Sequence, residues 1–421
     1  MAKNLRWRGW TAYCILLRFY VKFISMRILL ITDHHEPTGG AERHFFELKS
    51  RLQQSPDLQV CSLGFAEQPT ETKDAIILKR PATRAAQFLS RFFFYPFLYL
   101  RLRKHIAAFK PDVIHLHNIK VYTRTLLRVL KDYPLVQTVH DYTVICPTGW
   151  NVHRDLSPCL TGVRRKCFWQ HQTKFSKPLY LAAAFSQQQL KYQLQKTVKQ
   201  FIAPSPLLAD YLRANHFHAV TTIAPFIEHH HPFPQSSIKP FHFLYAGQLA
   251  AHKGIHHLLR EFAKAVTEQP NLFLTLIGEG NLREELKQYA DSLGIHEHLR
   301  WLGWQQDLSF YYAEAVAVIF PSIGMESFGL VMTESMSRAR PVIATNRGHA
   351  PCLVRQEQTG LLYDPLQEGA LARCMIKLAN QPEFAQQLGE NAYQHIRQVM
   401  DNELILKQHL QCYQTAIKGQ M

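Results

Sequence analysis

Strand-length runs of apolar residues alternate with helical patterns along most of the chain, and this alternation limits the fold more than any other feature. The first run, 26–32 (MRILLIT), is followed by a loop with Gly39 and Gly40 and by a helical pattern over 41–52. Comparable runs, with helical stretches between them, recur at 112–116, 135–139 and 200–203. Strands that alternate with helices in this way form a parallel sheet covered by helices.

A second series of the same kind begins near residue 241, and 421 residues exceed what one hydrophobic core usually serves. Its strand-length runs lie at 241–245, 272–277, 299–302, 317–320 and 341–344. The segment 223–240, with four prolines and little periodicity, has the character of a linker. The sequence therefore predicts an α/β protein with two Rossmann-like doubly wound domains, 26–222 and 241–394, whose ligands bind beyond the carboxyl ends of the strands.

The chain is basic, with 48 Lys and Arg against 32 Asp and Glu and a formal charge of +16. This balance favours partners that carry phosphate, which include nucleic acid, an anionic membrane and phosphorylated small molecules. No Lys/Arg run of the nucleic-acid type occurs, and many basic residues lie among aromatic ones, as in 91–103 (RFFFYPFLYLRLR). We therefore expect an anionic membrane surface as a partner, and no nucleic acid.

The first 25 residues form an extension for which three interpretations remain open. The apolar stretch 10–25 is short and is interrupted by Arg18 and Lys22, so it does not have the pattern of a transmembrane helix. It is an in-plane membrane anchor, a lead-in helix, or the result of a start codon assigned upstream of Met26. Eight cysteines in so long a chain are no disulfide framework, which favours a reducing compartment. We expect a cytoplasmic protein, peripheral on the inner face of the membrane.

Three cysteines, Cys146, Cys159 and Cys167, cluster in the sequence near His153 and His171. A structural metal site can be drawn from them, since thiolates and imidazoles are zinc ligands. Their spacing matches no standard metal motif, and scattered cysteines are more often structural. The expectation is therefore that no metal binds.

The strongest local signal is 321–340 (PSIGMESFGLVMTESMSRAR), where Glu326 and Glu334 lie on either side of a strand-to-helix junction. Glu334 falls about two turns into the helix, so both carboxylates can face one pocket while backbone N–H groups near Gly329 point at an anion. Carboxylates suit sugar hydroxyls, which donate hydrogen bonds as well as accept them. The alternative is an ordinary helix whose first turns carry glutamates that favour its dipole.

The second signal is 245–254 (YAGQLAAHKG), in which a strand ends at Gly247 and Lys253 precedes a further glycine and a helix. Glycine lets the backbone approach a phosphate and the ammonium supplies countercharge, although a lysine in such a loop is often merely solvated. We expect the loop with Gly39 and Gly40 to lie opposite, across an interdomain cleft, and it lacks the spacing of a dinucleotide fingerprint. His140 ends a strand, where residues that handle an acceptor belong, although backbone groups can equally satisfy it.

In their order, these segments resemble the family 4 retaining glycosyltransferases of the GT-B fold, also described as glycosyl transferases group 1. The resemblance covers nearly the whole chain from Met26. It rests on MRILLITDHHEPTGGAER, KPDVIHLHN, the strand that ends in His140-Asp141, FIAPS, YAGQLAAHKG, and the glutamate pair followed by RPVIATNRG and TGLLYDP. Each motif alone is weak, but the ordered set is highly specific.

The resemblance implies a GT-B architecture in which two domains face each other across a cleft. In such an arrangement 26–222 binds the acceptor, 241–394 binds a nucleotide sugar, and a helix in 395–421 crosses back to the first domain. The catalytic residues are expected to be Glu326, which lies against the transferred sugar, and His140, near the acceptor and the anomeric carbon. The expected donor contacts are Gly39, Gly40, Gly247, Gln248, Lys253 on the diphosphate, Phe328, Gly329, Leu330, and Glu334 on the ribose.

Two departures from the family pattern bear on this site. Gln248 stands where the family usually has an arginine, so Lys253 is expected to carry more of the diphosphate charge. Gly348, His349 and Cys352 replace a usual Gly-Gly and a later glutamate. The chain contains no Asp-x-Asp, the motif with which the other large class of sugar transferases holds its metal, so transfer without metal is expected.

The function that the resemblance implies is retaining transfer from a nucleotide-diphosphate sugar to a glycan or lipid-linked acceptor, in cell-surface polysaccharide or lipopolysaccharide synthesis. The leaving diphosphate would help to take the acceptor proton, and positive charge on that diphosphate would be the main catalytic contribution. No cofactor beyond the donor substrate is expected. Two alternatives remain open, a catalytically silent GT-B protein that binds nucleotide or membrane, and a GT-B nucleotide-sugar epimerase.

Overall fold

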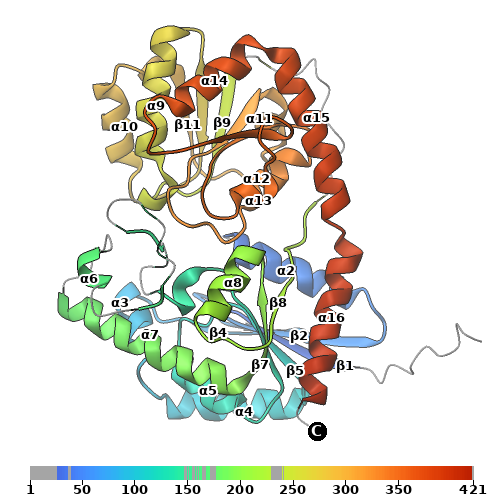
Figure 1. The fold of residues 1–421 in the computed structure, drawn as a ribbon. Helices are drawn as coiled ribbons and strands as arrows, with labels where there is room; N and C mark the ends of the chain where they lie inside the picture. Colours follow the sequence, from blue (N-terminus) through green and yellow to red (C-terminus); the bar gives the residue numbers. More distant parts are fainter. Residues whose placement is uncertain are drawn as a thin grey trace, which may run out of the picture.

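The computed structural model describes residues 26–36, 39–146, 149, 151–153, 157, 159, 161–163, 167–170, 177–228, 239 and 241–419. These residues form two domains, each built around one β-sheet (Figure 1). The first sheet has eight strands in the order β3-β4-β2-β1-β5-β6-β7-β8, and the second has six in the order β11-β10-β9-β12-β13-β14. All pairs are parallel except β3 with β4. The prediction of an α/β protein with two parallel-sheet domains is confirmed.

The first domain contains every strand up to residue 222. Its strands are β1 (Met26–Ile31), β2 (Leu58–Ala66), β3 (Thr70–Glu71), β4 (Ala75–Lys79), β5 (Val113–Leu116), β6 (Leu135–Thr138), β7 (Val198–Ala203) and β8 (Val220–Thr222). Its helices are α2 (Gly40–Gln53), α3 (Arg84–Leu89), α4 (Pro96–Phe109), α5 (Thr123–Leu130), η1 (Tyr142–Val144), α6 (Cys167–Gln170), α7 (Lys177–Thr197) and α8 (Pro206–Ala214).

The second domain repeats the alternation of strand and helix. Its strands are β9 (His242–Ala246), β10 (Phe273–Ile277), β11 (Leu299–Leu302), β12 (Ala317–Phe320), β13 (Val342–Thr345) and β14 (Gly360–Tyr363). Its helices are η3 (Ala251–Lys253), α9 (Ile255–Glu268), α10 (Arg283–Ser292), η4 (His296–His298), α11 (Ser309–Glu314), α12 (Leu330–Met336), α13 (Ala350–Leu353), α14 (Ala370–Asn380) and α15 (Pro382–Val399).

The central strands explain the apolar runs of the sequence. Every residue of β5, β6, β12 and β13 is buried, because helices cover both faces of each sheet. Runs of this kind were predicted for most of the strands. The sequence patterns missed β2, β3, β4, β8 and β14, and β2 in particular is broken by Ser62 and Gly64.

The last helix, α16 (Asn402–Lys418), leaves the second domain and lies along the first, where it contacts α2, β5, β6 and β7 (Figure 1). Asp401 begins this helix by accepting hydrogen bonds from the backbone N–H groups of Glu403 and Leu404. The predicted domain boundary at residue 394 lies inside α15, and the chain crosses at the break between α15 and α16. One buried hydrophobic cluster includes Ile28 of β1, Met332 of α12 and Tyr413 of α16, so the two domains share a core.

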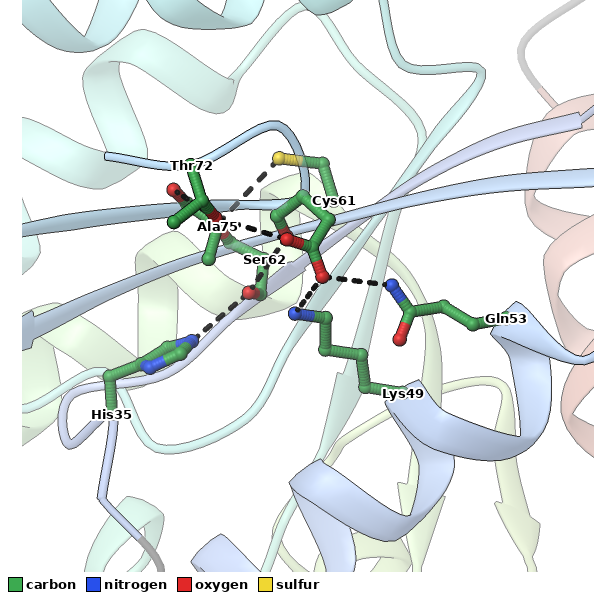
Figure 2. Close-up of polar contacts among 8 residues, drawn as sticks. His35, Lys49, Gln53, Cys61, Ser62, Thr72 and Ala75 are labelled. Carbon is green, nitrogen blue, oxygen red and sulfur yellow. Dashed lines mark hydrogen bonds and ion pairs between the residues drawn. The ribbon is translucent and has the colours of Figure 1, made fainter. Parts of the chain in front are cut away.

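A polar network fixes α2 against the edge of the first sheet (Figure 2). The carboxylate of Asp74 accepts hydrogen bonds from Lys49 Nζ at 3.0 Å, Gln53 Nε2 at 3.1 Å and Thr72 Oγ1 at 3.0 Å. Ser62 Oγ, 3.0 Å from His35 Nε2, donates to the Asp74 carbonyl at 3.2 Å. These contacts fix the position of α2, whose Arg43 reaches Glu334 of the second domain.

Two predictions fall partly or wholly outside the described residues. The extension 1–25 lies outside them, as does most of the predicted linker 223–240, of which 223–228 and residue 239 are described. Within the part of the chain that is described, no helix is both long and apolar enough to cross a membrane.

Candidate active site

The second sheet reverses its strand order between β9 and β12, and the loops that follow these two strands carry the central residues of the site. From β9 the chain continues to β10 and β11 on one side, whereas β12 continues to β13 and β14 on the other. Such a reversal leaves a crevice at the carboxyl ends of the two strands, where ligands bind in open α/β sheets. Lys253 follows β9, and Glu326 follows β12.

Lys253 and Glu326 form an ion pair at this crevice. Lys253 Nζ lies 2.6 Å from Glu326 Oε1, and Ser322 Oγ donates a hydrogen bond of 2.8 Å to the same oxygen. The two side chains are 23% and 17% exposed, so the pair is mostly shielded but still open to a ligand. Two residues predicted separately, 73 positions apart, therefore meet in one site.

The ionisation of this pair follows from its surroundings. Burial acts to raise the pKa of Glu326, but the charge and hydrogen bond of Lys253 outweigh it, so the pKa is lowered. Next to the pair, burial and the charge of Lys253 lower the pKa of His252 to about 4. At neutral pH the crevice thus holds an ionised Glu326 and a neutral His252.

Two glycines with left-handed backbone allow the loops of the site to approach each other closely. A Cβ atom on Gly254, which has φ of +72°, would lie 2.0 Å from the Pro321 carbonyl oxygen. A Cβ atom on Gly348, which has φ of +58°, would lie 2.6 Å from the backbone nitrogen of Glu326. Both positions need glycine for conformation and for space, so they set the distance between the lysine loop and the glutamate loop.

This close approach predicts unequal effects for two similar substitutions. Gly254→Ala and Gly294→Ala each place a side chain at φ near +70°, which costs about 1–2 kcal/mol. Nothing lies within 4 Å of the Cβ position at Gly294, whereas at Gly254 the Pro321 carbonyl is in the way. We expect Gly254→Ala to lower the unfolding midpoint clearly more than Gly294→Ala in urea titrations. Equal midpoints for the two variants would contradict the proposed contact between the loops.

Glu334 is held by different partners from those of Glu326. Its Oε1 lies 3.2 Å from Arg43 Nη1 of α2, and its Oε2 accepts a hydrogen bond of 3.0 Å from the hydroxyl of Tyr312. A cavity of about 630 Å³ borders all three residues and also Trp304 and Arg338. The two glutamates of the motif therefore have different partners, and Glu334 lies next to α2 of the first domain.

The loop between the two glutamates faces the first domain. Ser327 Oγ donates a hydrogen bond of 2.6 Å to the backbone carbonyl of His140. Gly329, with φ of +93°, precedes α12, and Phe328 is buried with its ring stacked 5.2 Å from that of His349. The predicted glycine loop approaches here as well, since a Cβ atom on Gly40 would lie 3.0 Å from Leu330 Cδ1. Gly39 is the residue before α2.

The side chain of Gln248 makes no polar contact with any described residue. It is exposed, and its backbone carbonyl accepts a hydrogen bond of 2.9 Å from the Tyr245 hydroxyl. The backbone at Gly247 is tightly enclosed, because a Cβ atom on Gly278 would lie 1.9 Å from the Gly247 carbonyl oxygen. An uncharged side chain thus occupies the position where an arginine was expected from the resemblance.

His140 lies after β6 at the carboxyl edge of the first sheet and borders a cavity of about 590 Å³. Its Nε2 is 2.9 Å from Nδ1 of His117, and burial lowers its pKa to about 4, so it is neutral at neutral pH. It belongs to a group of rings in mutual contact that the sequence patterns did not reveal, formed by His44, His115, His117, His140 and His409. Only the repeated histidines of HLH at 115–117 hinted at it.

The described residues contain no group of three or more His, Cys, Asp or Glu side chains arranged to hold a metal. Cys146, Cys159 and Cys167 are all buried near Tyr180, whose pKa is raised by burial first and by these cysteines second. His171, the more distant candidate ligand, lies outside the described residues.

Comparison with protein families matches the chain in two adjoining parts. Residues 38–231 match the family described as Glycosyltransferase Family 4, and residues 227–395 match Glycosyl transferases group 1. The lipopolysaccharide core biosynthesis glycosyltransferase LpsE of Rhizobium meliloti is 28% identical over 39% of this chain and 47% of its own length. The chain spans less than half of the first three curated relatives, between 17% and 47% of each.

Solved structures resemble the chain over nearly its whole length. Sucrose-phosphate synthase from Thermosynechococcus elongatus has a TM-score of 0.74 at 20% identity, and the likeness covers 94% of this chain and all of that one. HepE of Anabaena, in complex with UDP and glucose, has a TM-score of 0.69 at 19% identity, over 92% of this chain and 98% of that one. At these identities the likeness concerns the fold, and it confirms the predicted GT-B architecture.

Proposed function

Because the chain belongs to the glycosyl transferases of group 1 and family 4, we propose that it moves a sugar from a nucleotide-diphosphate sugar to a glycan or lipid-linked acceptor. The observation that carries this proposal is the ion pair of Lys253 and Glu326 at the strand-order reversal of the second sheet. The pair offers a cation for a diphosphate and a carboxylate for sugar hydroxyls in one crevice.

The donor is proposed to bind the second domain, 241–394, with its diphosphate on Lys253. Glu326 then faces the transferred sugar, and the ammonium of Lys253 is shared between this carboxylate and the phosphate oxygens. Glu334 accepts hydrogen bonds from the ribose, and the cavity of about 630 Å³ beside it takes the nucleoside. Backbone and side-chain contacts come from Gly39, Gly40, Gly247, Gln248, Phe328, Gly329 and Leu330.

The proposed reaction keeps the anomeric configuration. An acceptor hydroxyl attacks on the face from which the diphosphate leaves, and a leaving-group oxygen takes its proton. Lys253 stabilises the negative charge that develops on the diphosphate, and in this proposal it supplies the charge that a divalent metal supplies in other transferases. His140, neutral at the boundary between the domains, can hydrogen-bond the reacting sugar or the acceptor without adding charge.

The acceptor is proposed to bind the first domain, 26–222, in the cavity of about 590 Å³ that His140 borders. Several relatives carry names from surface polysaccharide synthesis, among them LpsE and the O-antigen chain mannosyltransferase C of Escherichia coli. We therefore propose a role in the synthesis of cell-surface polysaccharide or lipopolysaccharide, at the inner face of the membrane.

Donor binding and sugar transfer test this function in two stages. A panel of nucleotide-diphosphate sugars is screened by thermal unfolding, since a ligand that binds only the native state raises its stability according to affinity. The donor that raises the midpoint is then supplied with a radiolabelled sugar, together with a membrane lipid extract. A donor that binds but yields neither transfer nor hydrolysis would favour the catalytically silent alternative, and release of an isomerised nucleotide sugar would favour the epimerase.

The second part of the proposal is that the protein docks on an anionic membrane through α4. Phe97 is 88% exposed and Leu100 is 61% exposed, and the cationic side chains of Arg101, Arg103 and Lys104 are exposed on the same helix. Apolar side chains beside cations suit the boundary between lipid headgroups and acyl chains.

Charge reversal on α4 tests this docking. We expect Arg101→Glu with Lys104→Glu to lower binding to phosphatidylglycerol vesicles by about tenfold or more, because each cation contributes about 1 kcal/mol near an anionic surface. The matched control is Lys407→Glu with Lys418→Glu on α16, which changes net charge equally at another surface. Sedimentation with vesicles measures both. Equal binding of the two double variants would remove α4 from the proposal.

A further inference from the structure

The cavity of about 590 Å³ beside His140 has walls that the proposed reaction does not use. One wall comes from α7, whose Gln187, Gln189 and Gln193 line the cavity with uncharged amides. Another comes from the segment that joins α3 and α4 and from the first turn of α5, which contribute Arg91 and Arg124. The lining of the cavity therefore includes a neutral histidine and two guanidinium groups.

Arg91 is a half-buried cation on the wall of this cavity. Its Nε donates a hydrogen bond of 2.7 Å to the Lys120 carbonyl, and its guanidinium lies 5.5 Å from the centre of the Phe88 ring. These contacts orient the group. Its two terminal NH2 groups make no hydrogen bond with any residue that the structure describes, so they remain available to a ligand in the cavity.

Two carboxylates, Asp33 and Asp141, attract Arg91, but neither forms an ion pair with it among the described residues. Lys120 Nζ is paired with Asp141 at 2.8 Å, so this carboxylate already has a cationic partner. Asp33 accepts hydrogen bonds from the backbone N–H groups of Lys120 and Val121, and burial raises its pKa to about 7. Arg124 is exposed, donates a hydrogen bond of 3.4 Å to the Phe92 carbonyl, and has no ion pair with a described carboxylate.

From this arrangement we propose that Arg91 and Arg124 bind an anionic group of the acceptor, a phosphate or a carboxylate, while an acceptor hydroxyl lies at His140. Guanidinium groups bind such anions through two parallel hydrogen bonds, which fixes orientation as well as position. The amides of α7 suit the hydroxyls of the acceptor sugar. The inference rests on the proposed function, since it names the acceptor of the same reaction.

Two acceptors share this chemistry, a phosphorylated or acidic glycan and a sugar on a lipid diphosphate. They are separated with two probes, a hexose 6-phosphate and farnesyl diphosphate, titrated calorimetrically into the full-length protein saturated with UDP. The proposed donor site places UDP at Lys253, so that the probes report on the first domain. Hexose and farnesol, which lack the anion, are the reference ligands.

The variants are Arg91→Gln and Arg124→Gln, with Arg128→Gln as the matched control. Arg128 is also on α5, one turn after Arg124, but does not line the cavity. Loss of a charge-assisted hydrogen bond is expected to weaken probe binding about tenfold or more in each of the first two variants and not in the control. Arg124→Gln keeps the test valid if Arg91→Gln fails to fold, because Arg124 is on the surface.

Binding of the hexose phosphate alone assigns the anion to the glycan, and binding of farnesyl diphosphate alone assigns it to the lipid carrier. The inference is overturned if neither anionic probe binds, if hexose or farnesol binds equally well, or if Arg128→Gln weakens binding as much as Arg124→Gln. Failure here with intact donor binding at Lys253 would leave the proposed transferase function standing. Absence of nucleotide binding would instead count against that function.

Discussion

Lys253→Ala is expected to lower kcat/KM for sugar transfer by about 10²–10³-fold, the usual effect of removing one preorganised group that stabilises developing charge. Two losses combine in this variant. The diphosphate loses its cation, and the Glu326 carboxylate, 17% exposed, loses the ammonium 2.6 Å away. Gln248, uncharged and exposed, provides no substitute cation in the same loop. Lys253→Met, which keeps most of the side-chain stem, is expected to lose nearly as much.

Steady-state kinetics and calorimetric titration with the nucleoside diphosphate measure the effect of Lys253. Lys287→Ala is the control, because Lys287 forms a comparable ion pair with Glu284 at 3.3 Å on the surface of α10. Surface pairs contribute little, so this control should behave like the wild type. If Lys253→Ala retains activity within tenfold of the wild type, Lys253 does not carry the diphosphate charge.

Glu326→Gln is expected to lower transfer by a similar factor, about 10²–10³-fold, while binding of the nucleoside diphosphate changes little. Glutamine keeps the shape and the hydrogen bond with Ser322 but removes the charge facing the sugar. Lys253 then keeps its ammonium for the diphosphate, so the two variants should differ in binding although both lose turnover. Glu334→Gln serves as the contrasting variant, with an expected effect mainly on nucleotide affinity, because Glu334 contacts Arg43 and Tyr312 and not Lys253.

The pH dependence of stability gives an independent check on Glu326. Burial acts to raise its pKa from the ordinary 4.5, but Lys253 outweighs burial and lowers it. Stability from a carboxylate with a lowered pKa is complete above the unfolded value of 4.5 and is lost as pH falls through the folded value. The difference in unfolding midpoint between wild type and Glu326→Gln should therefore be constant near neutral pH and shrink below 4.5. A difference that grows in acid would contradict the ion pair.

The two-domain α/β fold could be predicted because its central strands are buried on both faces. Each of β1, β5, β12 and β13 is a nearly continuous apolar run, and such runs can be recognised without knowledge of their neighbours. β2 escaped prediction because Ser62 and Gly64 interrupt it. The serine is buried there only because the Asp74 carbonyl and His35 satisfy its hydroxyl. The predicted boundary at residue 394 falls inside α15, whose helical pattern continues to residue 399.

Part of the candidate site could also be predicted, because some of its residues lie close together in the sequence. Glu326, Glu334 and the glycines around them belong to a single loop and helix, and Lys253 stands in a loop with its own glycines, so short patterns revealed each of them. Whether Lys253 touches Glu326 depends on the strand order, which places β9 beside β12 and leaves β10 and β11 outside. No spacing in the sequence encodes that order.

The remaining residues of the site are visible only once the chain has folded. Arg43 reaches Glu334 from the other domain, and His409 joins the histidines behind His140 because α16 returns to the first sheet. The sequence pattern placed Arg91 in a membrane-facing segment. In the structure Arg91 contacts Phe88 and Lys120 and lines a cavity. Periodicity and glycine loops indicate the local backbone conformation of a segment, and this was enough to predict the fold and the donor loops. Contacts between distant segments depend on how the sheets are ordered and packed, and these decided which side chains share a site.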